Sequence, residues 1–104
     1  MAQLSVQEIS RTGSAPTFGA AASLGDSFPN SGEEIFIVKN GAVAAIDVTI
    51  KAISKCSHGV LHDLVVEVPA SGERWFARLD PSRYGNTVEI TYEAVTTVTV
   101  AVIR

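Results

Sequence analysis

Short runs in which apolar and polar residues alternate fill the chain from residue 34 onward, and they predict β-strands. Successive side chains of a strand point to opposite faces, so this alternation indicates one buried face and one solvated face. The residues expected to face inward are Ile46, Val48, Ile50 and Ala52 in 44–53, Leu64, Val66 and Val68 in 61–68, Val88, Ile90 and Tyr92 in 87–93, and Val98, Val100 and Val102 in 95–103. One wet face per sheet favours antiparallel pairing.

Two further strands have less regular patterns. Residues 34–39 form a nearly continuous apolar run, which is typical of a strand buried on both faces. In 73–79 the alternation places Trp75 in the core, together with Ala77 and Leu79. The opposite side is then an aromatic and basic stripe, which packs under a neighbouring loop, contacts another protein or, least favoured by the acidic net charge, stacks on nucleic-acid bases. The stripe comprises Arg74, Phe76 and Arg78.

Turn signals separate these runs. Asn40-Gly41 and the PASG segment 69–72 predict tight turns, and 54–59 and 80–86 are expected to be loops, with Tyr84 anchoring the second. Residues 4–9 predict an imperfect strand of the kind found at a sheet edge, because Glu8 and Ile9 break its alternation. About seven to eight short strands and no convincing helix predict an all-β, antiparallel fold, either a two-sheet β-sandwich or a small barrel.

Residues 10–33 interrupt this pattern, because Gly, Ala, Ser and Pro dominate them. We expect a long loop or arm, which either covers the surface of its own domain or becomes ordered against a partner chain. The apolar anchors available for such docking are Phe18, Leu24 and Phe28.

Composition narrows the classes of protein. A chain of 104 residues predicts one domain, 1–104, and 46% apolar residues exclude disorder throughout. A net charge of −3 argues against a nucleic-acid partner. The single cysteine excludes an internal disulfide, and we expect neither a membrane span nor a signal peptide, hence a soluble protein made inside the cell.

No catalytic or metal-binding pattern stands out. Cys56, His58, His62 and Asp63 lie close together, but they lack the paired spacing of zinc sites. No nucleophile elbow, phosphate-binding loop or calcium loop occurs. The neighbouring carboxylates, Glu33 with Glu34 and Glu89 with Glu93, are expected to be solvated. We therefore expect no enzyme activity, no cofactor and no metal.

Four segments carry a resemblance: MAQLSVQEISRTG, DSFPNSGEEIFIVKNG, VPASGERWFA and NTVEITYEAVTTVTVAVIR. Together they resemble a family of small tailed-bacteriophage virion proteins that includes head decoration (cement) proteins. The resemblance implies a jelly-roll-like β-sandwich on the capsid surface, made in the bacterial cytoplasm. It implies binding to the major capsid protein and to copies of itself, and it assigns a role to no individual residue.

Three other functions remain open at this stage. A head–tail connector or tail protein of the same virion would share the sequence features and differ in copy number. A carbohydrate-binding module would need exposed aromatic residues, for which Phe18, Phe76 and Tyr84 are candidates. A small enzyme would require Cys56, His58 and His62 to converge with a carboxylate in a pocket.

Overall fold

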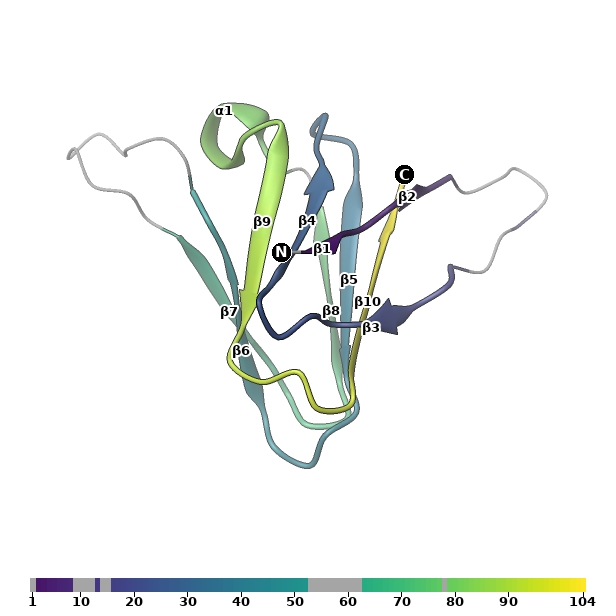
Figure 1. The fold of residues 1–104 in the computed structure, drawn as a ribbon, viewed down its shortest axis with the longest axis vertical. Coiled ribbons are helices and arrows are strands. Elements are labelled where there is room, and N and C mark those ends of the chain that lie inside the picture. Colours follow the sequence, from purple (N-terminus) through teal and green to yellow (C-terminus); the bar gives the residue numbers. More distant parts are fainter. Residues whose placement is uncertain (1, 9–12, 14–15, 53–62, 78) are drawn as a thin grey trace.

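The computed structural model describes residues 2–8, 13, 16–52, 63–77 and 79–104. Within these residues, ten strands and one short helix form an all-β body of two facing sheets (Figure 1). The first sheet has the order β1-β4-β9-β6-β7, with β1 at Ala2–Gln3, β4 at Asp26–Pro29, β9 at Thr87–Tyr92, β6 at Ile46–Ile50 and β7 at Leu64–Val68. The second has the order β2-β10-β5-β8, with β2 at Val6–Gln7, β10 at Val98–Ile103, β5 at Ile35–Asn40 and β8 at Glu73–Ala77.

The strand pairs follow a nested pattern. Among the described strands, β6 pairs with β7, β5 with β8, β4 with β9, and β3 (Gly19–Ala20) with β10, each pair antiparallel and each enclosing the one before it. Successive pairs lie in alternate sheets, so the chain folds like one long hairpin that has been rolled up.

The N-terminal residues depart from the predicted antiparallel pairing. β1 pairs parallel with β4, and β2 pairs parallel with β10. The strand expected over 4–9 is shorter than predicted within its described part: β2 covers Val6–Gln7 and lies at the edge of the second sheet. A separate strand, β1, precedes it and joins the first sheet. The N-terminal segment thus ties the two layers together at their edges (Figure 1).

The alternating strands are buried as their patterns predict. Ile46, Val48 and Ile50 of β6 are at most 4% exposed, and the inward residues of β9 and β10 pack into the same core. The run 34–39 is buried on both faces at its centre, since Phe36, Ile37 and Val38 have no exposed surface, but Lys39 at its end is exposed. Phe36 lies at the centre of this core, with its ring centroid 5.8 Å from that of Phe28 and 5.7 Å from that of Phe76.

The predicted faces of β8 are reversed. Trp75, expected in the core, is 59% exposed, whereas Phe76, expected at the surface, is only 7% exposed. Register explains the reversal, because Phe76 pairs with Phe36 on the inner face and Trp75 pairs with Ile37 on the outer face. Leu79 is buried as expected, but it lies beyond the end of β8 and so does not report on the orientation of the strand.

The segment 10–33 is not a structureless arm within its described part. It contributes β3 and also β4, which lies between β1 and β9 in the first sheet. Phe28 of β4 has no exposed surface, so it is a core residue rather than an anchor for a partner. Backbone pairing with β9, in which Phe28 lies opposite Val88, stabilises a strand that the local sequence does not favour by itself.

The loop expected at 80–86 contains the helix α1, Pro81–Tyr84. The Asp80 carboxylate accepts a hydrogen bond from the Ser82 amide at 3.0 Å, and Pro81 occupies the first turn, where its missing N–H costs nothing. Tyr84 is half-buried and packs against the core, in keeping with an anchoring role. Among the described residues, no helix is long and apolar enough to cross a membrane.

Candidate functional site

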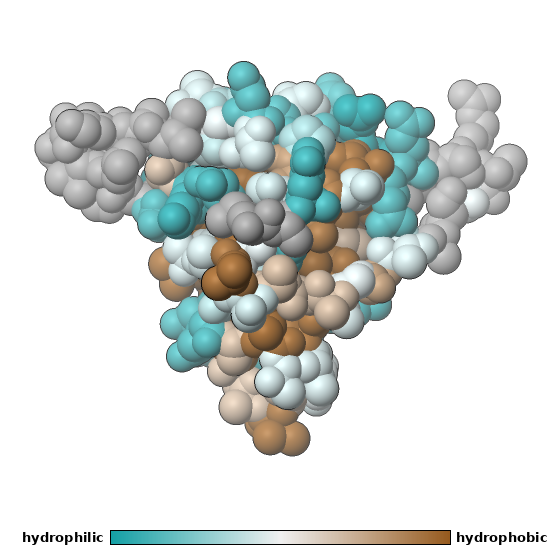
Figure 2. All heavy atoms as spheres, viewed as in Figure 1, coloured by the Kyte–Doolittle hydropathy of each residue, from teal (hydrophilic) through white to brown (hydrophobic). Residues whose placement is uncertain are grey.

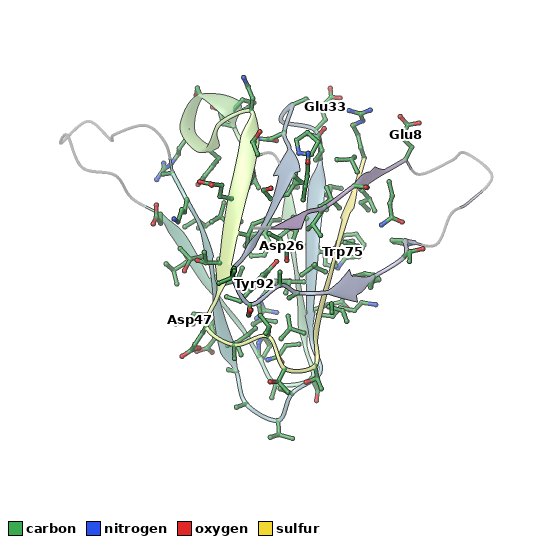
Figure 3. The ribbon with its side chains drawn as sticks, viewed as in Figure 1. Glu8, Asp26, Glu33, Asp47, Trp75 and Tyr92 are labelled. Atoms are coloured by element: carbon green, nitrogen blue, oxygen red, sulfur yellow. The ribbon has the colours of Figure 1, made fainter. Side chains whose placement is uncertain are left out.

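The two ends of the molecule differ in charge. At one end lie the segments 41–45, 69–72 and 94–97, which contain no Asp, Glu, Lys or Arg and are bordered by Glu93, the first residue of the β9–β10 connection. The β3–β4 connection, 21–25, is also without charge and joins them from the side, and we call the four segments together the uncharged end. Figure 1 shows the β5–β6, β7–β8 and β9–β10 connections together at its lower end. Glu8 and Glu33 lie toward the other end (Figure 3). In Figure 2 the lower tip is brown and white, without the teal of charged residues.

Backbone hydrogen bonds join these connections into one surface. Within it, the Gly41 amide donates to the Thr97 carbonyl at 2.9 Å, and the Ser71 amide donates to the Ala42 carbonyl at 3.2 Å. The β3–β4 connection attaches through the Ala21 amide, which lies 3.0 Å from the Val98 carbonyl oxygen. The uncharged end is therefore a single assembled surface rather than four separate loops.

The buried side chain of Asn40 fixes the conformation of the 41–45 loop at the tip of this surface. Its side chain is 2% exposed, and its Nδ2 lies 2.9 Å from the Ala44 carbonyl oxygen and 3.3 Å from those of Val68 and Pro69. Its Oδ1 accepts a hydrogen bond from the Ala42 amide at 3.0 Å. A buried amide with its hydrogen bonds satisfied holds the 41–45 loop in one conformation.

Two large apolar side chains stand out from this end. Val43 is 99% exposed and Leu24 is 79% exposed, the highest values among the exposed large hydrophobic residues of the described chain. When a complementary apolar surface covers such side chains, their removal from water lowers the free energy of the complex. The arrangement thus suits contact with another protein.

The residues proposed from the sequence as protein contacts divide into three groups. Leu24 and Arg74 are exposed, and Phe18 is half-buried with its ring centroid 4.1 Å from the Lys39 ammonium. Phe28 and Phe76 belong to the core and present no surface to a partner in this fold. Arg78 lies outside the described residues.

Sequence reasoning missed Val43 and Asn40. A signal was present, since GAVAA places apolar residues directly after a turn, where polar residues are usual. The predicted Asn40-Gly41 turn drew attention to backbone conformation, and the buried contacts of the Asn40 side chain depend on the distant 69–72 turn.

The metal-site candidates remain without support. Cys56, His58 and His62 lie outside the described residues. Asp63 accepts a hydrogen bond from the Ala52 amide at 2.9 Å. Within the part of the chain that the structure describes, no group of three or more His, Cys, Asp or Glu side chains could hold a metal ion.

Glu34 corrects the expectation of solvated carboxylates. It is 3% exposed, and its Oε1 accepts hydrogen bonds from the Ser31 amide at 2.7 Å and the Ser31 hydroxyl at 2.9 Å. Its Oε2 lies 3.3 Å from an Arg104 nitrogen, which links β5 to the end of the chain. Burial acts to raise the pKa of Glu34, but the hydrogen bonds from Ser31 outweigh it and hold the pKa below its ordinary value.

A lowered pKa in the folded state makes stability depend on pH. The carboxylate stabilises the fold above the unfolded-state pKa, near 4.5, and this contribution is lost as the pH falls through the folded-state pKa. We expect Glu34→Gln to lower the free energy of unfolding by about 1 kcal/mol at pH 7, because the amide keeps one acceptor but loses the charge. The deficit relative to the natural chain should shrink on acidification.

Denaturant unfolding at pH 7 and at decreasing pH below 4.5 measures this deficit. Glu33→Gln is the matched control, since Glu33 is the exposed neighbour. A constant deficit for Glu34→Gln across this range would contradict the assignment.

Comparison with known proteins gives no relative: no protein-family model, no curated protein and no solved structure matches this chain. The function is therefore inferred from the resemblance in the sequence and from the surfaces of the fold.

Proposed function

We propose that the chain is a bacteriophage capsid decoration (cement) protein, which binds the outside of the major capsid protein shell and stabilises it. The observation that carries the proposal is the uncharged end, where Val43 and Leu24 project from a fixed surface. Such a protein works by covering and joining its neighbours, so an exposed apolar side chain such as Val43, on a loop that Asn40 holds in one conformation, is the feature it needs. It acts on the virion surface, together with copies of itself.

The finer description of the fold, a jelly roll, belongs to this proposal. The four nested antiparallel pairs support it, because a long hairpin rolled into two sheets is the arrangement that defines jelly rolls. Virus capsid domains are among the proteins with this architecture, as are lectins. The fold alone does not decide between such roles.

Shells prepared without this protein provide the test. The purified chain is added to them and the bound fraction is measured by sedimentation, together with the temperature at which the shells break. We expect saturable binding at hundreds of copies per shell and a higher breaking temperature. Roughly six to twelve copies would instead indicate the ring of a head–tail connector or tail. No binding would overturn the proposal.

The uncharged end is tested with a matched pair of variants. Val43→Asp is expected to weaken binding at least about tenfold, because docking would bury an unpaired carboxylate. Val65→Asp introduces the same charge on β7, where Val65 is 56% exposed on the first sheet, and should bind normally. Circular dichroism checks that both variants fold. Equal binding by the natural chain and Val43→Asp would remove this end from the interface.

A further inference from the structure

A groove on the side of the second sheet borders the uncharged end and shares Gly41, Ser71, Gly72 and Thr97 with it. It has a volume of about 440 Å³ and lies where β5, β8 and β10 approach the uncharged end. Its polar lining comes from Lys39, Asn40, Ser71, Glu73, Thr97 and Thr99. Lys39 faces Glu73 on one side and Thr99 on the other in the strand register, so these three side chains form one row across the outer face.

Trp75 lies beside this row. It is two residues from Glu73 on the same face of β8, and its Nε1 donates a hydrogen bond to Glu73 Oε2 at 2.7 Å. The bond joins the indole to a residue that lines the groove, while 59% of Trp75 remains exposed. Figure 3 shows Trp75 among the strands of the second sheet.

The chemistry of the lining restricts the ligand. Lys39 and Glu73 contribute one positive and one negative charge, so the groove favours a neutral molecule over a phosphate chain, which needs several cations. Hydroxyls such as that of Thr99 donate and accept hydrogen bonds, which suits a ligand with many hydroxyls of its own. The negative face of an exposed indole attracts the weakly positive C–H groups of a sugar ring.

We propose that Trp75 and this groove form a binding site for a neutral saccharide. The indole stacks against one sugar ring, and Glu73 and Thr99 hydrogen-bond the hydroxyls of the ring that enters the groove. The sequence did not indicate this site, because its alternation assigned Trp75 to the core. The test uses the isolated chain, so its outcome does not depend on whether the chain binds a capsid.

Trp75 is the only tryptophan of the chain, so intrinsic fluorescence reports on the site directly. The full chain is titrated with maltopentaose, cellopentaose, xylopentaose and chitopentaose, and amide NMR shifts locate the contact. We expect a saturable change in emission with at least one of them, with a dissociation constant of about 1 mM or tighter. The accompanying amide shifts should centre on Lys39, Glu73 and Thr99.

Two matched threonine variants test whether the saccharide binds in this groove or elsewhere on the chain. Thr99→Val keeps the tryptophan and should weaken saccharide binding at least about threefold, because a hydrogen bond to the ligand is lost. Thr91→Val makes the same change on β9 of the first sheet and should bind normally. Three outcomes would overturn the proposal: no saturable response to any of the four saccharides, a response unaffected by Thr99→Val, or a response to adenosine monophosphate alone.

Discussion

Replacing Phe36 with alanine is expected to lower the free energy of unfolding by about 3–5 kcal/mol. Phe36 has no exposed surface, and its ring contacts Phe28 from the first sheet and Phe76 from its own sheet. Truncation removes aromatic contacts on both sides and leaves a cavity that the rigid strands around it cannot fill. Guanidinium unfolding followed by circular dichroism measures the loss.

Trp75→Ala is the comparison for this prediction, because it removes a larger side chain from β8. We expect it to cost less than about 1 kcal/mol, since Trp75 is 59% exposed. Circular dichroism is the suitable probe, because the variant has no tryptophan fluorescence. If the two variants lost similar stability, the orientation of β8 described above would be wrong.

β6 and β8 show where sequence patterns predict faces and where they do not. β6 alternates cleanly between apolar and polar residues, and only one face of it can be buried without burying charges such as Asp47. β8 carries Trp75 on one face and Phe76 on the other, so either orientation buries an aromatic ring. The register with β5 decides, because it places Phe76 beside Phe36.

β4 shows why the segment 10–33 was misjudged. Its four residues include a single large apolar side chain, Phe28, and end in proline, so no local pattern marks a strand. The strand exists because β9 offers it a complete antiparallel partner and the core offers Phe28 an apolar site. Such non-local pairing is invisible in a short sequence window.

The candidate surfaces were predictable only in part. Leu24 was identified from its isolation among small residues, and it is exposed as docking requires. The uncharged end was not identified, because it assembles from four connections that are far apart in the sequence. The groove beside Trp75 likewise depends on the register of three strands, which no composition or spacing reveals.

A second large loss of stability is expected when the side-chain hydrogen bond between Tyr92 of β9 and Asp26 of β4 is removed. Tyr92→Phe is expected to lower the free energy of unfolding by about 1.5–3 kcal/mol. The Tyr92 hydroxyl donates to Asp26 Oδ2 at 2.6 Å, and Asp26 is 1% exposed (Figure 3). The same oxygen accepts a hydrogen bond from the Ala22 amide at 3.2 Å, so removal of the hydroxyl takes the shorter of these two hydrogen bonds from a buried carboxylate.

The same pair makes the fold sensitive to alkaline pH. Burial, followed by the hydrogen bond to Asp26 and its negative charge, raises the pKa of Tyr92 above the ordinary value of 10.0. A raised folded-state pKa means that the stabilisation is complete below pH 10 and declines above it, because only the unfolded chain then loses its proton easily. The free energy of unfolding of the natural chain should therefore fall above pH 10. That of Tyr92→Phe should fall less, so that the difference between the two chains becomes smaller.

Urea unfolding of the natural chain and Tyr92→Phe at about pH 8 and about pH 11 tests this convergence. The difference between the two chains isolates Tyr92, since lysines that titrate in the same range are common to both. Tyr84→Phe removes the other tyrosine hydroxyl and should leave the difference in place. A deficit for Tyr92→Phe that stayed constant up to pH 11 would show that its hydroxyl does not hold the Asp26 carboxylate, and that β4 and β9 are joined at this point by their backbones alone.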